Sequence, residues 1–513
     1  MATVCRAETI PFTLLQLNDV YEIAPIDNGR WGGLARVANL RQQLEQANPH
    51  TYTVLAGDFL SPSALGTALY NGDRLAGKQM VAVLNAMGLD YAAVGNHEFD
   101  VNAQQFRQRI TESDFQWLSA NIADGAGNQF ESIKPYEILT IPGAEGGEVK
   151  VGILALTIDS NAVDYVSYSE PIATARRYID NLQGAVDVWV ALTHLSLAQD
   201  LALAQAIPEL DLILGGHEHE NIQRNHLIIK PDSSASCPQA QTPIFKADAN
   251  ARTVYIHQLT YDTDRQCLQI DSQLQPITAA IASDPATEKV VEQWQEIGFN
   301  AFRQQGFEPM AVVVKSPIAL DALDAHVRSG STNLTRLITR AMEQENPEAA
   351  MVIFNGGMVR LDDLLSAGAI TQYDIIRLLP FGGRVVTVDM QGDLLQKVLA
   401  QGEKNSGTGG YLQLGGMASN SIEPSKTYRV ALMEYLLTGQ EVGLDYLTAN
   451  TPGLKVIDHG RDIRAILVDY LQNNAQQAFT HLEDLWTNNP LVNQIPAQLI
   501  RSIQSDWNNY QSS

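Results

Sequence analysis

Short apolar runs alternate with amphipathic segments along the first half of the chain. Runs such as FTLLQL and TYTVLAG stop abruptly at a polar residue. Runs of this length are typical of strands that are buried on both faces of a sheet. Between them, residues 32–48 and 77–88 repeat apolar side chains at helical spacing, which predicts helices with one buried face. This alternation of strands and helices predicts a layered α/β domain.

The pattern changes further along the chain and divides it into segments. From about residue 240 it becomes β-rich, and a long amphipathic helix is predicted to link this part to a second α+β domain. That domain contains a helix after Ser331 and a glycine-rich segment, SGTGGYLQLGGM. The predicted divisions are a first domain over 1–284, a linker helix over 285–309, a second domain over 310–472 and a C-terminal helical extension over 473–513.

The overall charge restricts the classes of partner. The chain has 34 Lys and Arg against 58 Asp and Glu, a formal net charge of −24 over 513 residues. A surface this negative repels nucleic acids and anionic membranes, so neither is expected as a partner. No run approaches the roughly 18–20 apolar residues that span a bilayer. A small anionic substrate is still possible if a local pocket is cationic.

The cysteines and the N-terminus bear on the cellular compartment. Cys5, Cys237 and Cys267 are odd in number, widely separated and without a CxxC pair. We therefore expect no disulfide framework and no thiolate metal site. The N-terminal sequence MATVCRAETI lacks the apolar region of a secretory signal, which predicts a cytoplasmic protein. The sequence gives no indication of the oligomeric state.

Possible metal ligands follow five predicted strands at the point where each strand ends. Because ligands bind beyond the carboxyl ends of strands in open α/β sheets, we expect these side chains at one edge of a single sheet. Any one of them alone is more typical of a turn, a helix cap or a structural histidine. Together, carboxylate, amide and imidazole groups favour a site for ions such as Mn, Fe, Zn or Mg. The residues are Asp19, Asp58, Asn96, His194, His217 and His219.

The motifs QLNDVY, GD, GNHEFD, TH and GGHEH, in this order, resemble those of the calcineurin-like metallophosphatases, and within them the 5′-nucleotidase family. The resemblance implies a four-layer α/β/β/α metallophosphatase domain followed by a smaller α+β nucleotidase domain. It also implies two divalent metal ions (Mn, Zn, Co, Fe or Mg) that share one carboxylate. On this resemblance, Asp19, Asp58 and His219 hold one ion, and Asp58, Asn96, His194 and His217 hold the other.

The resemblance also implies a mechanism, in-line attack on phosphorus by a metal-bridging hydroxide. Two dications lower the pKa of a bridging water and hold the attacking and leaving oxygens. His97 is placed to stabilise or protonate the leaving oxygen. Asp100 resembles the carboxylate that orients this histidine, although a helix N-cap is an alternative role. We expect no catalytic role for Glu98 or Glu218.

Tyr21 departs from the family pattern. The family usually has Asp-x-His in its first motif, and this chain has Asp19-Val20-Tyr21. A tyrosine can bind a hard metal ion, or it can simply fill space. We expect activity to survive with an altered metal preference.

The resemblance continues more loosely into the second domain. VRSGSTNLTRLITRAM and NGGMVR match family segments whose Arg and Asn side chains contact the phosphate, base or ribose. On this match the substrate-binding residues are Arg328, Asn355 and Arg360, although ordinary surface arginines are an alternative. Tyr411 in GGYLQLGGM matches one aromatic of a base-stacking clamp. The second, GGDGY-like motif is broken in LLTGQEVGLDYLT, where Tyr446 is the candidate.

The expected function is metal-dependent phosphoester hydrolysis, with a nucleoside 5′-monophosphate as the substrate. One alternative is a metallophosphatase for another small ester, such as a 2′,3′-cyclic nucleotide, a nucleotide sugar or a sulfur-containing substrate. Another is a catalytically silent nucleotide-binding homologue. Replacing His97 with alanine distinguishes an enzyme, which would lose turnover, from a binding protein, which would be indifferent.

Overall fold

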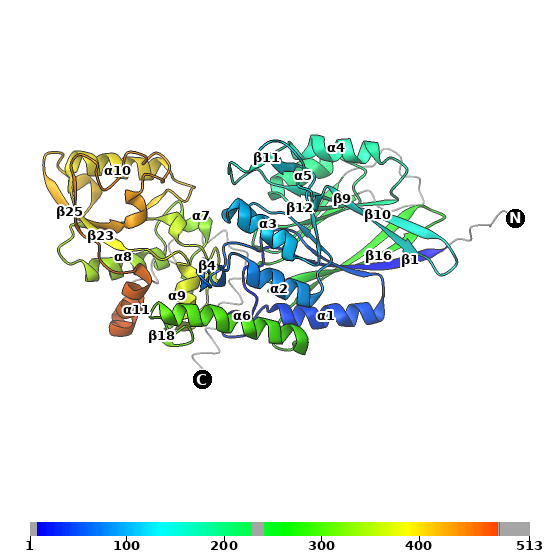
Figure 1. Ribbon diagram of the computed structural model, residues 1–513, viewed down its shortest axis with the longest axis horizontal. Helices are drawn as coiled ribbons and strands as arrows, with labels where there is room; N and C mark the ends of the chain where they lie inside the picture. The colour runs from blue at the N-terminus through cyan, green and yellow to red at the C-terminus, as the bar shows by residue number, and fades with distance from the viewer. Residues whose placement is uncertain (1–7, 228–240, 481, 483–513) are drawn as a thin grey trace. The chain divides into compact units, whose positions relative to one another are not determined.

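The computed structural model describes residues 8–227, 241–480 and 482, and divides the chain into two compact units (Figure 1). The first unit extends to Ala301, and the second begins at Phe302. The division falls within helix α6 (Pro285–Gln304). Each unit has its own sheets and apolar core.

Two sheets form the centre of the first unit. In the first sheet the order is β17 (Cys267–Pro276), β16 (Thr253–Asp262), β1 (Thr9–Leu17), β2 (Thr51–Leu55), β5 (Tyr91–Ala93), β6 (Gln116–Leu118) and β8 (Ile133–Lys134). In the second it is β14 (Ile222–Leu227), β15 (Gln241–Lys246), β13 (Leu212–Gly215), β12 (Val188–His194), β10 (Glu148–Thr157) and β9 (Tyr136–Pro142). Short pairs β3 (Leu69–Tyr70) with β4 (Asp73–Arg74), and β7 (Ile122–Asp124) with β11 (Val166–Tyr168), complete the unit.

Alternation of side chains along β12 produces the layers. Val188, Val190 and Leu192 join the core between the two sheets. Trp189 and Ala191 point to the other face, where they pack with helices α4 (Pro171–Asn181) and α5 (Leu197–Ala206). Figure 1 shows α1 (Leu34–Ala47) and α2 (Lys78–Met87) on the opposite side of the sheets from α4 and α5. Helix α3 (Ala103–Glu112) follows α2 in the sequence. The expected four-layer α/β/β/α architecture is confirmed.

The expectation that all the polar strand ends share one sheet is wrong. β1, β2 and β5 are parallel neighbours in the first sheet, whereas β12 and β13 are parallel neighbours in the second. A buried strand has the same apolar pattern in either sheet, so the sequence pattern does not distinguish a sandwich from one wide sheet. The site is therefore built from the carboxyl ends of strands in two packed sheets.

A buried polar bridge joins these two sheets. The Gln16 side chain on β1 donates from Nε2 to the carbonyl oxygens of Gly215 (3.0 Å) and Phe245 (2.9 Å) in the second sheet. Its Oε1 lies 2.9 Å from His257 Nε2, and His257 Nδ1 lies 2.7 Å from Ser272 Oγ. Since Gln16 Oε1 can only accept, His257 donates from Nε2 and accepts at Nδ1. The imidazole is held neutral between two partners.

The state of His257 predicts a pH dependence of stability. Burial lowers the pKa of His257 to about 3, so between that value and the ordinary value of about 6.5 only the unfolded chain takes up the proton. Unfolding free energy should therefore fall as the pH falls, with a slope from this residue that rises to about 1.4 kcal/mol per pH unit near pH 5. Urea unfolding of the metal-free protein between pH 6.5 and 5 measures the slope, which His257→Gln should reduce. The exposed control His459→Gln should not; equal slopes in all three proteins would contradict the assignment.

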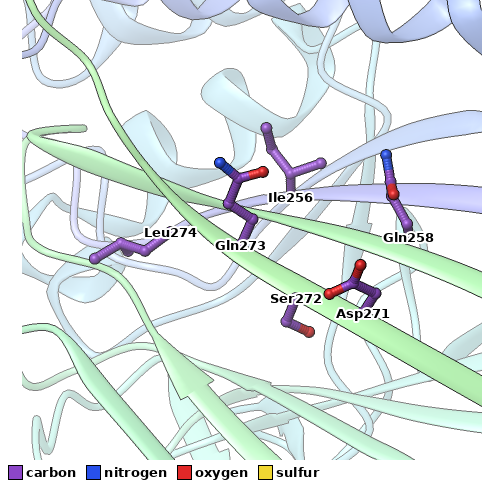
Figure 2. Close-up of a pocket in the computed structure, with 6 residues that line it drawn as sticks. All are labelled: Ile256, Gln258, Asp271, Ser272, Gln273 and Leu274. Carbon is purple, nitrogen blue, oxygen red and sulfur yellow. The ribbon is translucent and has the colours of Figure 1, made fainter.

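A cavity of about 400 Å³ lies on the hairpin that carries His257. Figure 2 shows its lining residues on β16 and β17, and Ser272, the partner of His257, is among them. None of the predicted site residues lines this cavity. Its position is therefore separate from the polar strand ends.

The second unit is built on a five-stranded sheet with helices on both faces. Val352 and Phe354 of β20 (Met351–Asn355) pack with α8 (Asn333–Glu345) and α11 (Ile463–Asn473). Met351 and Ile353 pack on the other face with α10 (Gly392–Lys404). The strand order is β24 (Leu412–Gly416), β20 (Met351–Asn355), β25 (Thr427–Met433), β23 (Val385–Gln391) and β26 (Leu454–Asp458). Smaller elements are β18 (Val312–Ser316) with β22 (Gly368–Thr371), β19 (Leu320–Asp321) with β21 (Leu364–Leu365), α7 (Asp324–Val327), α9 (Gln372–Leu378) and α12 (Ala475–Ala478).

Cys267 at the start of β17 is disulfide-bonded, a bond that the expectation of no disulfide framework did not include. Three cysteines cannot all be paired, but two of them can form one disulfide bond. Cys5, Cys237 and residues 483–513 of the predicted helical extension lie outside the described residues.

Among the residues that the structure describes, no helix is both long enough and apolar enough to cross a membrane.

Candidate metal centre and active site

Backbone strain marks three of the predicted metal ligands. Asp19, Asp58 and His217 all have positive φ angles, of 53°, 57° and 82°. Residues other than glycine rarely adopt this conformation, which costs of order 1–3 kcal/mol and persists only where the surroundings enforce it. Each of these residues follows a strand that ends in the site, where the chain turns sharply and presents a polar side chain.

The structure brings Asp19, Asp58 and His194 into one buried cluster. One ligand atom from each lies within 4.8 Å of the other two. The His194 Nε2 atom lies 3.0 Å from Asp58 Oδ2 and 3.9 Å from Asp19 Oδ1. All three side chains are fully buried. Such a concentration of charge inside a protein needs a compensating partner.

The unpaired atoms of the cluster fit metal ions. His194 donates from Nδ1 to the carbonyl oxygen of Ala56 (2.7 Å), which leaves the lone pair on Nε2 directed at the carboxylates. Within the described part of the chain, His194 Nε2 and Asn96 Oδ1 are buried and have no hydrogen-bond partner. An imidazole nitrogen beside two carboxylates, together with a buried amide oxygen, matches the donor set of a transition-metal site.

The two histidines of GGHEH lie at the same place. The His217 backbone N–H donates to Asp19 Oδ2 (2.9 Å), and the His217 ring lies edge-on to the ring of His194. His219 Nε2 lies 3.6 Å from Asp19 Oδ1. His217 and His219 therefore lie beside the three-residue cluster, and Asn96 precedes His97, whose backbone N–H donates to Asp58.

Electrostatics in the cluster favours a positive charge beside the carboxylates. Burial opposes the charged imidazole of His194, but Asp58 and Asp19 outweigh it and raise the pKa of His194 to about 9. Burial likewise opposes the Asp58 carboxylate, but His194 and His97 lower the pKa of Asp58 well below its ordinary value. Burial lowers the pKa of His217, with His194 adding to the effect. Bound metal ions would supply this positive charge in place of protons.

Two glycines allow the loops to approach this closely. Gly57 has a φ of 82°, and a Cβ atom there would lie 2.6 Å from His194 Nδ1. A Cβ atom on Gly95 would collide with the carboxylate of Asp58. The glycines of GD and GNH therefore leave space for predicted ligands from other parts of the chain, His194 beside Gly57 and Asp58 beside Gly95.

Glu98 holds the loop that carries Asp58. Its fully buried carboxylate accepts the backbone N–H groups of Asp58 (2.9 Å), Phe59 (2.7 Å), Leu60 (3.1 Å) and Gly95 (2.6 Å). Burial, together with the charge of Asp58, raises the pKa of Glu98 to about 7. These four contacts fix the backbone on both sides of the cluster, which is a positioning role.

His97 and Asp100 form a hydrogen-bonded pair at the edge of the cluster. His97 Nδ1 lies 2.8 Å from Asp100 Oδ2, and the His97 backbone N–H donates to Asp58 Oδ1 (2.8 Å). The imidazole is about a quarter exposed, so it is accessible to a ligand. Asp100 does not cap helix α3, because Asn102 does so through a capping box with Gln105. The Asp100 carboxylate therefore pairs with His97 and not with the N-terminus of α3.

A buried lysine connects the two loops of the second sheet. Lys246 donates from Nζ to the carbonyl oxygens of Leu195 (2.6 Å) and Gly216 (2.7 Å), which adjoin His194 and His217 in the chain. Its charge is paired with Asp200 (2.8 Å) and Glu218 (2.5 Å). Glu218 also accepts the first N–H of α5, from Leu197, at 2.6 Å. The sequence analysis missed Lys246; the only signal is a charged residue at the end of an apolar strand.

In the second unit, three of the predicted substrate-binding segments lie side by side. Gly356 donates to the carbonyl oxygen of Tyr411 (2.7 Å), which joins the NGGM loop to the GGY loop. Gly407 donates to the carbonyl oxygen of Arg328 (2.8 Å). The Arg328 guanidinium forms an ion pair with Asp324, and the Arg360 guanidinium lies 5.9 Å from the ring centre of Phe381.

Glu441 is a further residue that the sequence analysis missed. Its buried carboxylate accepts a hydrogen bond from Asn355 Nδ2 (3.1 Å), and burial raises the pKa of Glu441. Glu441 lies in LLTGQEVGLDYLT, the segment in which the GGDGY-like motif is broken. Tyr446 instead packs against the apolar core, with Lys397 Nζ 3.4 Å from its ring centre.

Comparison with known proteins finds a matching family for each of the two structural units. Residues 12–221 match the calcineurin-like phosphoesterase family, and residues 312–422 match the 5′-nucleotidase C-terminal domain. Protein UshA of Yersinia enterocolitica is 26% identical over 85% of this chain and 86% of its own length. The 5′-nucleotidase of Bos taurus is 28% identical over 83% of this chain and 78% of its own.

Among solved structures, the fold is similar to the 5′-nucleotidase precursor of Thermus thermophilus. The TM-score is 0.66 at 21% identity, over 90% of this chain and 96% of that one. The two family matches together cover more than half of the chain, in the order that the two structural units follow. Enzymes of this kind use two divalent metal ions, for which the cluster of Asp19, Asp58 and His194 is suited. The chain is a phosphoester hydrolase of the calcineurin-like family that carries a 5′-nucleotidase C-terminal domain.

Proposed function

We propose that this hydrolase acts on nucleoside 5′-monophosphates and releases the nucleoside and inorganic phosphate. The observation that carries this proposal is the joining of a metal-binding cluster to a 5′-nucleotidase C-terminal domain in one chain. The names of relatives that align over most of the chain, 5′-nucleotidase among them, support the same substrate class. In the second unit, Arg328 and Arg360 supply cationic groups for phosphate oxygens, and Tyr411 supplies an aromatic ring for a base.

The metal ligands fall into two sets that share Asp58. Asp19, Asp58 and His219 form one set; Asp58, Asn96, His194 and His217 form the other. When bound, the metal ions supply positive charge to the transferring phosphoryl group and lower the pKa of the attacking water. The buried hydrogen bonds of Glu98 and Lys246 keep these ligands in place before substrate arrives.

His97 supplies the proton that the leaving oxygen needs. As water attacks phosphorus, the bond to the 5′ oxygen breaks and that oxygen needs a proton. Asp100 holds the Nδ1 side of the His97 ring, so a proton on the second nitrogen, Nε2, can pass to the leaving oxygen. His97 then takes a proton back from solvent.

The test is a screen of substrates and metals with one matched pair of variants. Adenosine and uridine 5′-monophosphates are compared with a nucleotide sugar, a 2′,3′-cyclic nucleotide and p-nitrophenyl phosphate, each with Mn, Co, Zn or Mg. Phosphate release should be fastest from the 5′-monophosphates. Tyr411→Leu should raise KM for them about 5- to 150-fold, the equivalent of one base stack, without changing KM for p-nitrophenyl phosphate. The control Tyr435→Leu, which removes an exposed tyrosine of the same unit, should change neither KM.

Two outcomes would contradict the proposal in different ways. A cyclic nucleotide or nucleotide sugar hydrolysed faster than every 5′-monophosphate would reassign the substrate within the same chemistry. No release of phosphate from any ester with any metal would remove the activity itself.

A further inference from the structure

Tyr21 lies inside the metal cluster rather than beside it. Its hydroxyl oxygen is 3.0 Å from His219 Nε2, 3.4 Å from Asp19 Oδ1 and 3.5 Å from Asp58 Oδ2. The side chain is buried, and its ring packs edge-on against the ring of His219. A tyrosine that only filled space would direct its hydroxyl to solvent or to a single partner. Here the hydroxyl faces the same three side chains that form the first ligand set.

The loop holds Tyr21 in this position through its backbone. The Tyr21 N–H donates to Asn250 Oδ1 (3.0 Å), and the Asn250 N–H donates to the carbonyl oxygen of Asp19 (2.8 Å). The N–H of Val20 donates to the carbonyl oxygen of Asp58 (2.9 Å). The direction of the phenol is therefore set by the same turn that presents Asp19.

The spacing of these donor atoms is that of the ligands around one ion. Donors at about 2.0–2.1 Å from a metal are about 2.9 Å apart when octahedral neighbours and about 3.4 Å apart when tetrahedral neighbours. The Tyr21 oxygen lies 3.0–3.5 Å from the other three atoms, and His219 Nε2 is 3.6 Å from Asp19 Oδ1. A single ion can therefore contact the Tyr21 oxygen together with these donors after small movements.

We propose that the Tyr21 phenolate oxygen is a ligand of the metal position formed by Asp19, Asp58 and His219, a role that rests on the proposed metal-dependent function. The phenol proton leaves to solvent as the oxygen binds. This position then has three anionic donors, Asp19, Asp58 and Tyr21. The other has only the shared Asp58, with amide and imidazole ligands. A hard, highly charged ion is favoured at the first position and a softer divalent ion at the second.

Spectroscopy of the full-length protein tests this ligand directly. Metal-free protein is titrated with iron(III), and the visible absorption of a phenolate-to-iron charge transfer is recorded while bound metal is counted by elemental analysis. Wild type should develop the band. Tyr21→Phe should lose the band while iron still binds, with at least tenfold weaker affinity at that position. Tyr52→Phe, which removes a half-buried tyrosine elsewhere in the unit, should behave as wild type.

A second variant separates the ligand role from a structural one. Tyr21→His replaces the phenol with the imidazole usual in the family, so metal binding should be retained without the charge-transfer band. A band that survives in Tyr21→Phe, or iron bound by wild type without any band, would overturn the assignment. Phosphate release by wild type is measured in parallel with Mn, Co, Zn and Mg. Its absence would contradict the proposed function, whereas the charge-transfer result is read independently of turnover.

Discussion

His97→Ala is expected to lower kcat by about 10² to 10⁴, the range of general acid catalysis, with little change in bound metal. The reason is that the His97 backbone N–H donates to Asp58, a contact that alanine keeps, while the His97 imidazole pairs with Asp100. Steady-state kinetics with a nucleoside monophosphate, and elemental analysis of the same samples, measure the two effects.

The choice of leaving group supplies a control for this result. p-Nitrophenolate leaves without needing a proton, so His97→Ala should lose much less activity on p-nitrophenyl phosphate than on a nucleotide. Asp100→Asn keeps the histidine and changes its orienting partner, so it should give a smaller loss and a shifted pH profile. An equal loss on both esters would show that His97 does not protonate the leaving oxygen.

Lys246→Met is expected to destabilise the first unit by about 3–5 kcal/mol, because it leaves the Asp200 carboxylate buried without its cation. Methionine preserves the length of the side chain, so the loss reports on charge and hydrogen bonds rather than on a cavity. Urea unfolding at pH 7 measures the change. Lys150→Met breaks an exposed pair with Glu148 and should cost less than about 1 kcal/mol.

The same variant should also weaken metal binding, since Lys246 holds the carbonyl oxygens of Leu195 and Gly216 next to His194 and His217. If Lys246→Met does not fold, Glu218→Gln tests the same network, because it keeps the shape and weakens the ion pair with Lys246. Variants of Lys246 and Lys150 with equal unfolding free energies would contradict a role for the buried network.

The sequence predicted those parts of the site whose signal is local. Apolar runs that end in Asp58 or His194 predict both a strand and the polar group at its carboxyl end, and the helices over 32–48 and 77–88 follow from their spacing. The division of these strands between two sheets was not predictable, because β2 and β12 are equally apolar. Local pattern identifies an element, whereas sheet membership depends on partners far along the chain.

The contacts missed in sequence are those between distant side chains. Lys246 pairs with Asp200, and Glu441 with Asn355, over 46 and 86 residues. Asn355 belongs to the NGGMVR motif, but no local pattern shows that it meets Glu441 or that Lys246 meets Asp200. The disulfide bond of Cys267 was not predicted for the same reason, because the sequence does not indicate which of three cysteines lie close together.

The two-sheet construction of the site has a consequence for how the protein folds. Asp19 and His217 are 198 residues apart in the chain and meet only when β1 and β13 are packed in the same sandwich. Such distant contacts form late, because a long loop must close first. Metal ions bind poorly before that step, so they cannot speed the search for the native state. Bound metal ions should instead lower the unfolding rate, and this lengthens the lifetime of the folded enzyme.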